Sequence, residues 1–102
     1  MIVRVSERAK YNRNQIVSYI LRQFGEQAVL DFRKAYKETK RFLAEHPKSS
    51  PKEENLSTEK YSYHFTFING LTKVVYRVDG EVVYLVDMWD VRREPPQEIR
   101  ES

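Results

Sequence analysis

Residues 67–94 read FINGLTKVVYRVDGEVVYLVDMWDVRRE, in which the turn dipeptides Asn69-Gly70 and Asp79-Gly80 separate three apolar runs. Asn-Gly and Asp-Gly are the strongest short-range signals for two-residue hairpin turns, because both central positions of such a turn need a positive φ angle. The segment therefore predicts three consecutive antiparallel strands. In this prediction Ile68 pairs with Leu71, and Val78 pairs with Glu81.

The residues before this segment predict one strand and two helices. Residues 2–5 form a short apolar run, and Ser6 is a suitable N-cap for a helix that ends near Gly25. From about Glu26 to Pro47, apolar residues recur every three or four positions, as in an amphipathic helix. We expect an α+β fold in which an N-terminal strand and a two-helix hairpin precede an antiparallel three-stranded meander that packs on the helices.

Length and composition limit how the chain is organised. A length of 102 residues allows one domain, expected over 1–96, and the charged residues 97–102 are expected to form a tail that is either disordered or ordered by a partner. The chain has no cysteine, and His46 and His64 lack the spacing of metal ligands, so we expect neither thiolate chemistry nor a metal or other cofactor. No apolar run has the length of a signal peptide core or a membrane span, so we expect a cytoplasmic protein without a membrane partner.

Basic residues are concentrated in the first half of the chain. Residues 1–48 carry 11 Lys and Arg against 5 Asp and Glu, whereas residues 49–102 carry 7 against 10. A basic half suits nucleic acid or an acidic protein partner, and it is also typical of solvated helix faces. Charge alone therefore leaves the partner open.

Side-chain alternation assigns each residue of the expected strands to one of two faces. With the register above, a large apolar set faces the helices: Tyr63, Phe65, Phe67, Val74, Tyr76, Val78, Val83 and Leu85. The opposite face has no helix left to cover it and carries His64, Thr66, Lys73, Val75, Arg77, Tyr84, Val86, Met88 and Asp90. Continuing the alternation of the last strand places Arg92 on this open face and Arg93 on the other.

The open face contains the candidate functional residues. Lysine is disfavoured in the middle strand of a sheet, so Lys73 either extends its stem across neighbouring valines to water or serves a function. Lys73 shares this uncovered face with His64 and Arg92, and the combination of the three favours a functional site. Further candidates for substrate binding are Thr66, Arg77, Tyr84 and Arg93.

The order of the expected elements resembles the RelE/ParE superfamily of toxins from bacterial type II toxin–antitoxin modules. Three stretches carry the resemblance: SERA at 6–9 where the first helix opens, LTKVVYRV at 71–78 in the central strand, and WDVRREP at 89–95 where the last strand ends. The resemblance implies a toxin that arrests growth and is held inactive by a small cognate antitoxin. Members of one branch cut messenger RNA on the ribosome, and members of another poison DNA gyrase.

The first hypothesis from this resemblance is metal-independent cleavage of ribosome-bound mRNA. RNA-cutting members use the open face, which implies Lys73 and Arg92 on the scissile phosphate and His64 as the acceptor of the 2′-OH proton. The chain lacks the tyrosine or histidine that several of these nucleases place after the final strand. Two alternatives therefore stay open: a gyrase inhibitor that acts by protein binding, and an inactive member that only binds its antitoxin.

The expected partner in all three cases is the antitoxin. Its binding segment should be amphipathic and should lay apolar residues along the helical pair or along Ile68, Leu71, Val86 and Met88. An acidic segment would also suit the basic first half of the chain.

Overall fold

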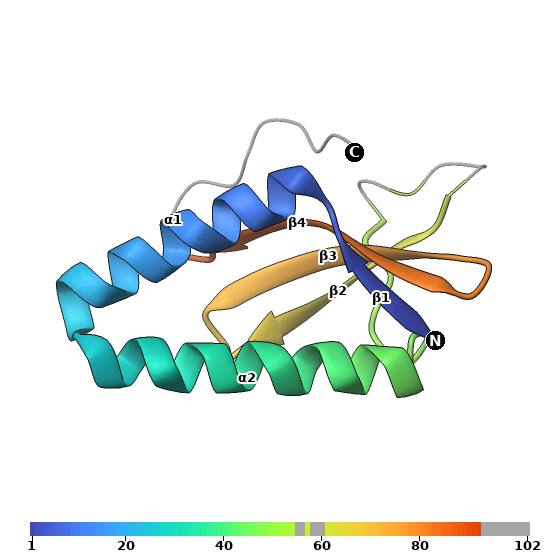
Figure 1. Cartoon of the computed structure of the whole chain (residues 1–102). Coiled ribbons are helices and arrows are strands. Elements are labelled where there is room, and N and C mark those ends of the chain that lie inside the picture. Colours follow the sequence, from blue (N-terminus) through green and yellow to red (C-terminus); the bar gives the residue numbers. More distant parts are fainter. Residues whose placement is uncertain (55–56, 58–60, 93–102) are drawn as a thin grey trace.

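The computed structural model describes residues 1–54, 57 and 61–92, and its elements follow the expected order (Figure 1). A short strand, β1 (Ile2–Val5), leads into the helices α1 (Glu7–Phe24) and α2 (Glu26–Glu45). The strands β2 (Tyr63–Ile68), β3 (Thr72–Asp79) and β4 (Val82–Asp90) complete the fold. The predicted α+β class, with its N-terminal strand, two helices and three-stranded meander, is confirmed, whereas the predicted tail at 97–102 lies outside the described residues.

Local signals shape the first half of the chain as predicted. The Ser6 hydroxyl accepts a hydrogen bond from the Ala9 amide at 3.0 Å and donates one to the Val86 carbonyl at 2.9 Å. It therefore caps α1 and also ties the start of this helix to β4. Gly25 adopts a φ angle of 90° between the two helices, a conformation that favours glycine. A single residue thus joins α1 to α2.

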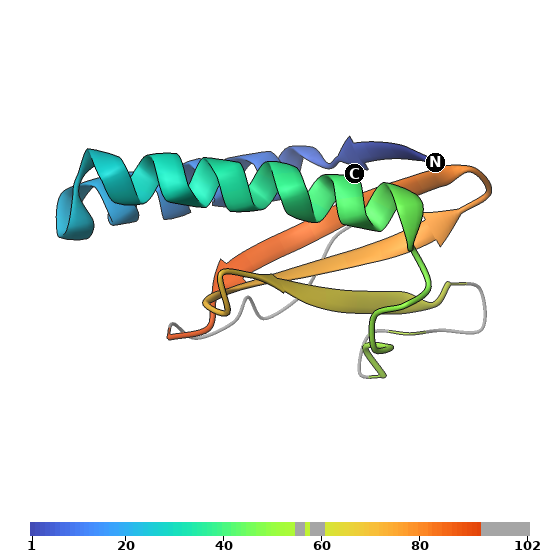
Figure 2. The same ribbon diagram turned by 90° about the horizontal axis from the view of Figure 1, so that it is seen from below.

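Both helices cover one face of a four-stranded sheet (Figure 2). The strand order is β1-β4-β3-β2, in which β1 runs parallel to β4 and the other neighbouring pairs are antiparallel. The main core lies between the helices and this face and includes the buried side chains of Phe32, Leu43 and Leu85. A smaller apolar cluster, which includes Val75 and Val86, lies on the opposite face, which no described helix covers.

The connection between α2 and β2 protects one edge of this sheet. The Glu53 amide donates to the Tyr63 carbonyl at 2.6 Å, and the Phe65 amide donates to the Pro51 carbonyl at 3.1 Å. Residues 51–53 therefore run beside β2 in the manner of a further strand. They satisfy backbone groups that an edge strand would otherwise leave unpaired.

The first hairpin loop is one residue longer than predicted. Asn69 and Gly70 adopt the expected positive φ angles of 52° and 71°, but Ile68 pairs with Thr72 rather than with Leu71. Leu71 stays in the loop, where its carbonyl accepts a hydrogen bond from the amide of Val91, just beyond β4, at 2.8 Å. The predicted register of β2 was therefore wrong by one residue, and each side chain of β2 lies on the face opposite to the predicted one.

The second hairpin also differs from the prediction, but the side chains next to it stay on the predicted faces of the sheet. Asp79 pairs with Val82, so the loop residues are Gly80 and Glu81, and Gly80 alone has a positive φ angle. The register is shifted by two residues relative to the prediction. Because side chains alternate with a period of two, Leu85 still faces the helices as predicted.

A β-bulge changes the faces in the second half of β4. The register between β3 and β4 shifts between Val75 and Tyr76, which leaves Val86 as an extra residue of β4. Such an extra residue reverses the alternation of the side chains that follow it. Met88 and Asp90 were predicted on the open face, and this prediction was wrong: Met88 is part of the main core, and Asp90 lines a cavity beneath α1.

Two side chains of α1 bind Asp87, the residue next to this bulge. The Asp87 carboxylate is fully buried and accepts hydrogen bonds from Arg8 Nε at 2.8 Å and from Asn12 Nδ2 at 2.5 Å. One of its oxygens also accepts from the Met88 amide at 2.8 Å. A buried carboxylate needs such partners, and α1 supplies two of them from beside β4.

Tyr76 anchors the chain after α2 to the core. Its side chain is fully buried, and its hydroxyl donates to the Pro47 carbonyl at 2.7 Å.

Tyr76→Phe is expected to lower the free energy of unfolding by about 1 kcal/mol, because the Pro47 carbonyl loses its donor. Urea unfolding measures the change, and Tyr11→Phe, at a position that is 64% exposed, is the control that should match the unchanged protein. Equal stability of both variants would show that the Tyr76 hydroxyl contributes nothing.

The Tyr76 hydroxyl also makes the free energy of unfolding decrease at alkaline pH. Burial raises the pKa of Tyr76, against a smaller opposing effect of a hydrogen bond with Ser50. The unfolded chain loses this proton near pH 10, whereas the folded chain keeps it to a higher pH. The stabilisation is therefore complete below about pH 10 and is lost as the pH rises through the raised value. Tyr76→Phe should lose less stability than the unchanged protein in this alkaline range.

Candidate functional site

Lys73 lies on the open face of the sheet, as predicted, and its charge is matched there. Its ammonium nitrogen lies 3.2 Å from a carboxylate oxygen of Glu53, which belongs to the connection before β2. It also lies 4.4 Å from the ring centre of Phe65 and 5.6 Å from that of Trp89. The ion pair and the two aromatic rings hold this ammonium group in place, so a substrate phosphate would compete with Glu53 for it.

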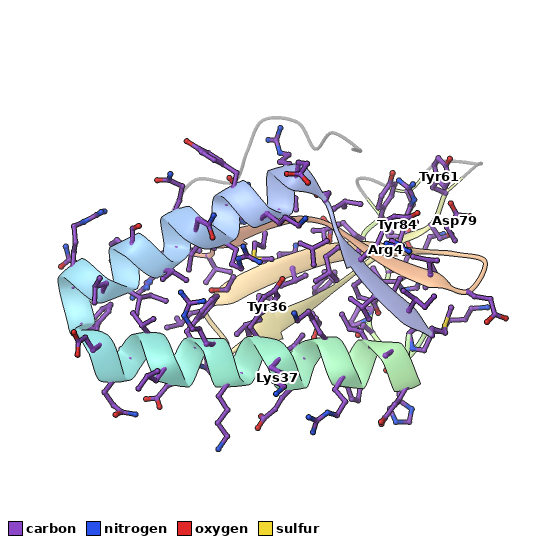
Figure 3. The ribbon with its side chains drawn as sticks, viewed as in Figure 1. Arg4, Tyr36, Lys37, Tyr61, Asp79 and Tyr84 are labelled. Carbon is purple, nitrogen blue, oxygen red and sulfur yellow. The ribbon has the colours of Figure 1, made fainter. Side chains whose placement is uncertain are left out.

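Arg77 and Tyr84 also lie on the open face and contact each other. The Arg77 guanidinium carbon lies 4.4 Å from the ring centre of Tyr61 and 5.1 Å from that of Tyr84. Tyr84 pairs with Arg4 of β1, and Figure 3 shows Arg4, Tyr84 and Tyr61 at the same end of the sheet. The open face thus combines cations with aromatic rings, and Arg77 is buried in this arrangement with an exposed fraction of 9%.

His64 lies on the helix side of the sheet, contrary to the prediction. Its ring stacks on Tyr76 with 5.6 Å between the ring centres, and its Nδ1 atom lies 3.0 Å from the Ser50 carbonyl oxygen. Because a carbonyl only accepts hydrogen bonds, we assign the proton to Nδ1 in this contact. Thr66 lies on the same side, where it lines a hollow together with Thr39 of α2.

Arg92 lies beyond the end of β4 and beside α1. Its guanidinium donates two hydrogen bonds to the Asp90 carboxylate, at 2.9 Å and 2.6 Å, and this interaction is the main cause that raises the pKa of Arg92. The guanidinium carbon also lies 5.5 Å from the ring centre of Tyr19 and 5.8 Å from that of Phe24, both on α1. The prediction that placed Arg92 on the open face was therefore wrong.

The predicted constellation of His64, Lys73 and Arg92 is not brought together. The register of β2 moves His64 to the helix side, and the bulge in β4 precedes the turn that takes Arg92 toward α1. Of the predicted residues, the open face holds Lys73, Arg77 and Tyr84, whereas Thr66 lies on the helix side and Arg93 lies outside the described residues. The roles given to all of them remain predictions.

An apolar cavity of about 400 Å³ lies between the β2–β3 loop and the ends of α1 and α2 that meet at Gly25. Phe24 and Leu71 line it and are 58% and 44% exposed. The apolar stripe predicted for the antitoxin is not accessible as a whole, because Ile68, Val86 and Met88 are buried and only Leu71 reaches the surface. Apolar contact with a partner is therefore available at this end of the helical pair rather than along the predicted stripe.

The described residues, 1–54, 57 and 61–92, contain neither a cluster of metal ligands nor a membrane-spanning helix. Within these ranges, no group of three His, Cys, Asp or Glu side chains is placed to hold a metal ion. No helix of the described chain combines the length and the apolar character needed to cross a membrane.

Comparison with known proteins agrees with this architecture. A family model described as the ParE toxin of the type II toxin–antitoxin system parDE matches residues 3–95. The chain belongs to the ParE toxin family. A search of curated proteins finds no match. The resemblance to RelE/ParE toxins is confirmed, and membership of this family implies a cognate antitoxin as the partner.

Basic side chains form a stripe on the outer side of α2 in this ParE-family toxin. Lys34, Lys37 and Arg41 are exposed, and their spacing of three and four residues places them on one face of the helix. Figure 3 shows that Lys37 points away from Tyr36. We call these three residues the α2 stripe. A stripe of this kind attracts acidic surfaces.

Sequence reasoning overlooked the residues that position the open face of this toxin. Glu53 neutralises Lys73, and Asp87, next to the bulge in β4, binds Arg8 of α1. The available signals were weak: an acidic pair at 53–54 in a polar connection, and one acidic residue inside an apolar strand. Neither signal identifies its basic partner, because that partner lies far away in the sequence.

Proposed function

We propose that this ParE-family toxin arrests growth by binding DNA gyrase and not by cleaving RNA. The observation that supports this proposal is the separation of the groups that a nuclease site would combine. Lys73 is paired with Glu53 on the open face, Arg92 is paired with Asp90 beside α1, and His64 lies on the helix side. An inhibitor that acts by protein binding does not need these groups in one place.

Cleavage of RNA through its own 2′-OH sets strict geometric demands. A base must come within about 2.6–3.2 Å of the hydroxyl while cations stabilise the oxygens of the adjacent phosphate. The sheet separates His64 from Lys73, because their side chains leave opposite faces of it. One phosphate therefore cannot contact Lys73 while its neighbouring 2′-OH meets His64.

The α2 stripe is a surface suited to a protein target. Its three cations are exposed on one face of a regular helix, and complementary charge speeds association and selects partners. Poisoning of gyrase is the activity that the superfamily resemblance assigns to its other branch. We therefore assign gyrase as the target and the α2 stripe as the surface that meets it.

His64→Ala is expected to leave growth arrest within about twofold of the unchanged protein, whereas a nuclease that uses His64 as its base would lose about 100-fold to 10,000-fold. Cells that express either form should show double-strand DNA breaks and intact mRNA. The purified proteins should inhibit DNA supercoiling by gyrase. His46→Ala, at an exposed position after α2, is the control for loss of a histidine.

Two results would contradict this function. Cleavage of ribosome-bound mRNA by the purified chain, lost in His64→Ala and accompanied by unaffected gyrase, would establish the nuclease hypothesis instead. Normal growth of cells that express the intact chain without antitoxin would establish instead that the chain is an inactive member of the family that only binds its antitoxin.

A further inference from the structure

A separate cluster of cations lies where the middle of α1 packs against the middle of α2, around Tyr36. The Lys40 ammonium nitrogen lies 4.4 Å from the centre of the Tyr36 ring, and the Arg13 guanidinium carbon approaches the same ring from α1 at 5.9 Å. Figure 3 shows the Tyr36 side chain between the two helices. We call Arg13, Tyr36 and Lys40 the helix-junction site. It shares no residue with the open face or with the α2 stripe.

The Tyr36 hydroxyl is a buried donor without an acceptor. The residue is 7% exposed, its ring stacks on Phe32, and its hydroxyl has no hydrogen-bond partner among the residues that the structure describes. The Tyr76 hydroxyl, by contrast, donates to the Pro47 carbonyl. Burial of a hydroxyl without a partner costs free energy, so an orphaned group of this kind points to a ligand that supplies the acceptor.

The two cations over the Tyr36 ring lack a counter-ion in the described part of the chain. Arg13 donates to the neutral side chain of Asn14, and no described carboxylate forms an ion pair with Arg13 or Lys40. Burial, and then the charges of Arg13 and Lys37, lower the pKa of Lys40. Mutually repelling cations over a ring that carries an unpaired hydroxyl donor favour the binding of an anion.

We propose that the helix-junction site binds a carboxylate side chain of the antitoxin, which accepts a hydrogen bond from the Tyr36 hydroxyl and is flanked by Arg13 and Lys40. The charged groups of both side chains now lie over the ring, and rotation of their long stems brings these groups to the carboxylate. Arginine suits this ligand because its planar guanidinium matches the two oxygens of a carboxylate.

A protein carboxylate fits this site better than a nucleic-acid phosphate. The hydroxyl is buried, so a ligand meets it only after the Arg13 and Lys40 side chains have moved. The end of a flexible acidic side chain needs less displacement of these groups than a phosphate that is held in a bulky backbone. Family membership implies an antitoxin, and the site lies in the basic first half of the chain, which suits an acidic partner. Antitoxin binding does not depend on whether the toxin acts on gyrase or on RNA.

Acetate, the smallest analogue of an aspartate side chain, tests the site in the full chain. In an NMR titration at constant ionic strength, acetate should shift the ring signals of residue 36 and the side-chain signals of Lys40. Tyr36→Phe should weaken acetate binding about tenfold, the loss expected when a hydrogen bond to a charged group is removed. Lys34→Gln, which removes a cation of the α2 stripe, should change acetate binding by less than about twofold.

Protein stability supplies a second readout that separates binding from folding. Tyr36→Phe should be at least as stable as the unchanged protein, because it deletes a buried donor that has no acceptor. Tyr76→Phe deletes a donor that has one, and it should be less stable. A hexaglutamate peptide should also bind the full chain more tightly than an oligothymidylate of equal charge.

Four results would overturn the proposal. The first is an acetate affinity that does not change in Tyr36→Phe, and the second is an equal loss of affinity in Lys34→Gln, which indicates diffuse attraction to positive charge. The third is a loss of stability in Tyr36→Phe as large as that in Tyr76→Phe. The fourth is tighter binding of oligothymidylate than of hexaglutamate that depends on the Tyr36 hydroxyl, which would assign the site to nucleic acid.

Discussion

Arg8→Ala is expected to lower the free energy of unfolding by about 3 kcal/mol, the largest effect on stability that we anticipate. The Asp87 carboxylate is fully buried at the β4 bulge, and Arg8 Nε donates to it at 2.8 Å. Removal of one partner leaves the other charge desolvated, and the remaining donors, Asn12 and the Met88 amide, are neutral. Urea unfolding of the variant and the unchanged protein measures the difference.

Two further variants separate this buried pair from a general loss of positive charge. Arg4→Ala removes an exposed arginine from β1 and should change the free energy of unfolding by less than about 0.5 kcal/mol. Arg8→Met combined with Asp87→Leu removes both charges and should recover most of the loss, because an apolar pair needs no counter-charge. A loss below about 1 kcal/mol in Arg8→Ala would show that Asn12 and the backbone suffice to hold Asp87.

Reversal of the α2 stripe, by Lys34→Glu, Lys37→Glu and Arg41→Glu together, is expected to weaken inhibition of gyrase by about 100-fold or more. The three cations would become three anions on the surface proposed to meet the target, and like charges facing each other cost several kcal/mol across an interface. All three positions are exposed, so the variant should stay folded. Supercoiling inhibition by the purified chain and growth arrest in cells measure the effect.

A second triple variant controls for net charge. Arg4→Glu, Lys10→Glu and Arg22→Glu also replace exposed basic residues, but these lie on β1 and α1. Each replacement changes the charge by two, so both triple variants carry a net charge of −3 instead of +3. The control should keep gyrase inhibition within about tenfold, since only long-range attraction is reduced. Equal losses in both variants would show that overall charge, and not the α2 stripe, governs binding to the target.

Much of the fold was predictable because its signals are short-range. Ser6 caps α1 through the Ala9 amide, Gly25 takes a positive φ angle between the helices, and the two glycine dipeptides mark the hairpin turns. Each signal acts through the conformational preferences of a few neighbouring residues. It can therefore be recognised without knowledge of where the rest of the chain lies.

The candidate site was less predictable because strand register is sensitive to single residues. Leu71 enters the first loop when its carbonyl bonds to the Val91 amide, and this one addition moves His64 to the helix side. Lys73 and Arg77 were placed on the correct face, because they alternate along β3 with apolar residues such as Tyr76 that face the helices.

By itself, the sequence determined the order of the elements, the α+β class, the family resemblance and the basic character of the first half of the chain. These properties depend on composition, motifs and local backbone preference. Only the tertiary structure decided which charged groups meet. Arg8 of α1 meets Asp87 of β4, the connection before β2 brings Glu53 to Lys73, and α1 brings Arg13 to Tyr36. Side chains on a strand alternate with a period of two, so one long-range contact that inserts a residue reverses every assignment beyond it.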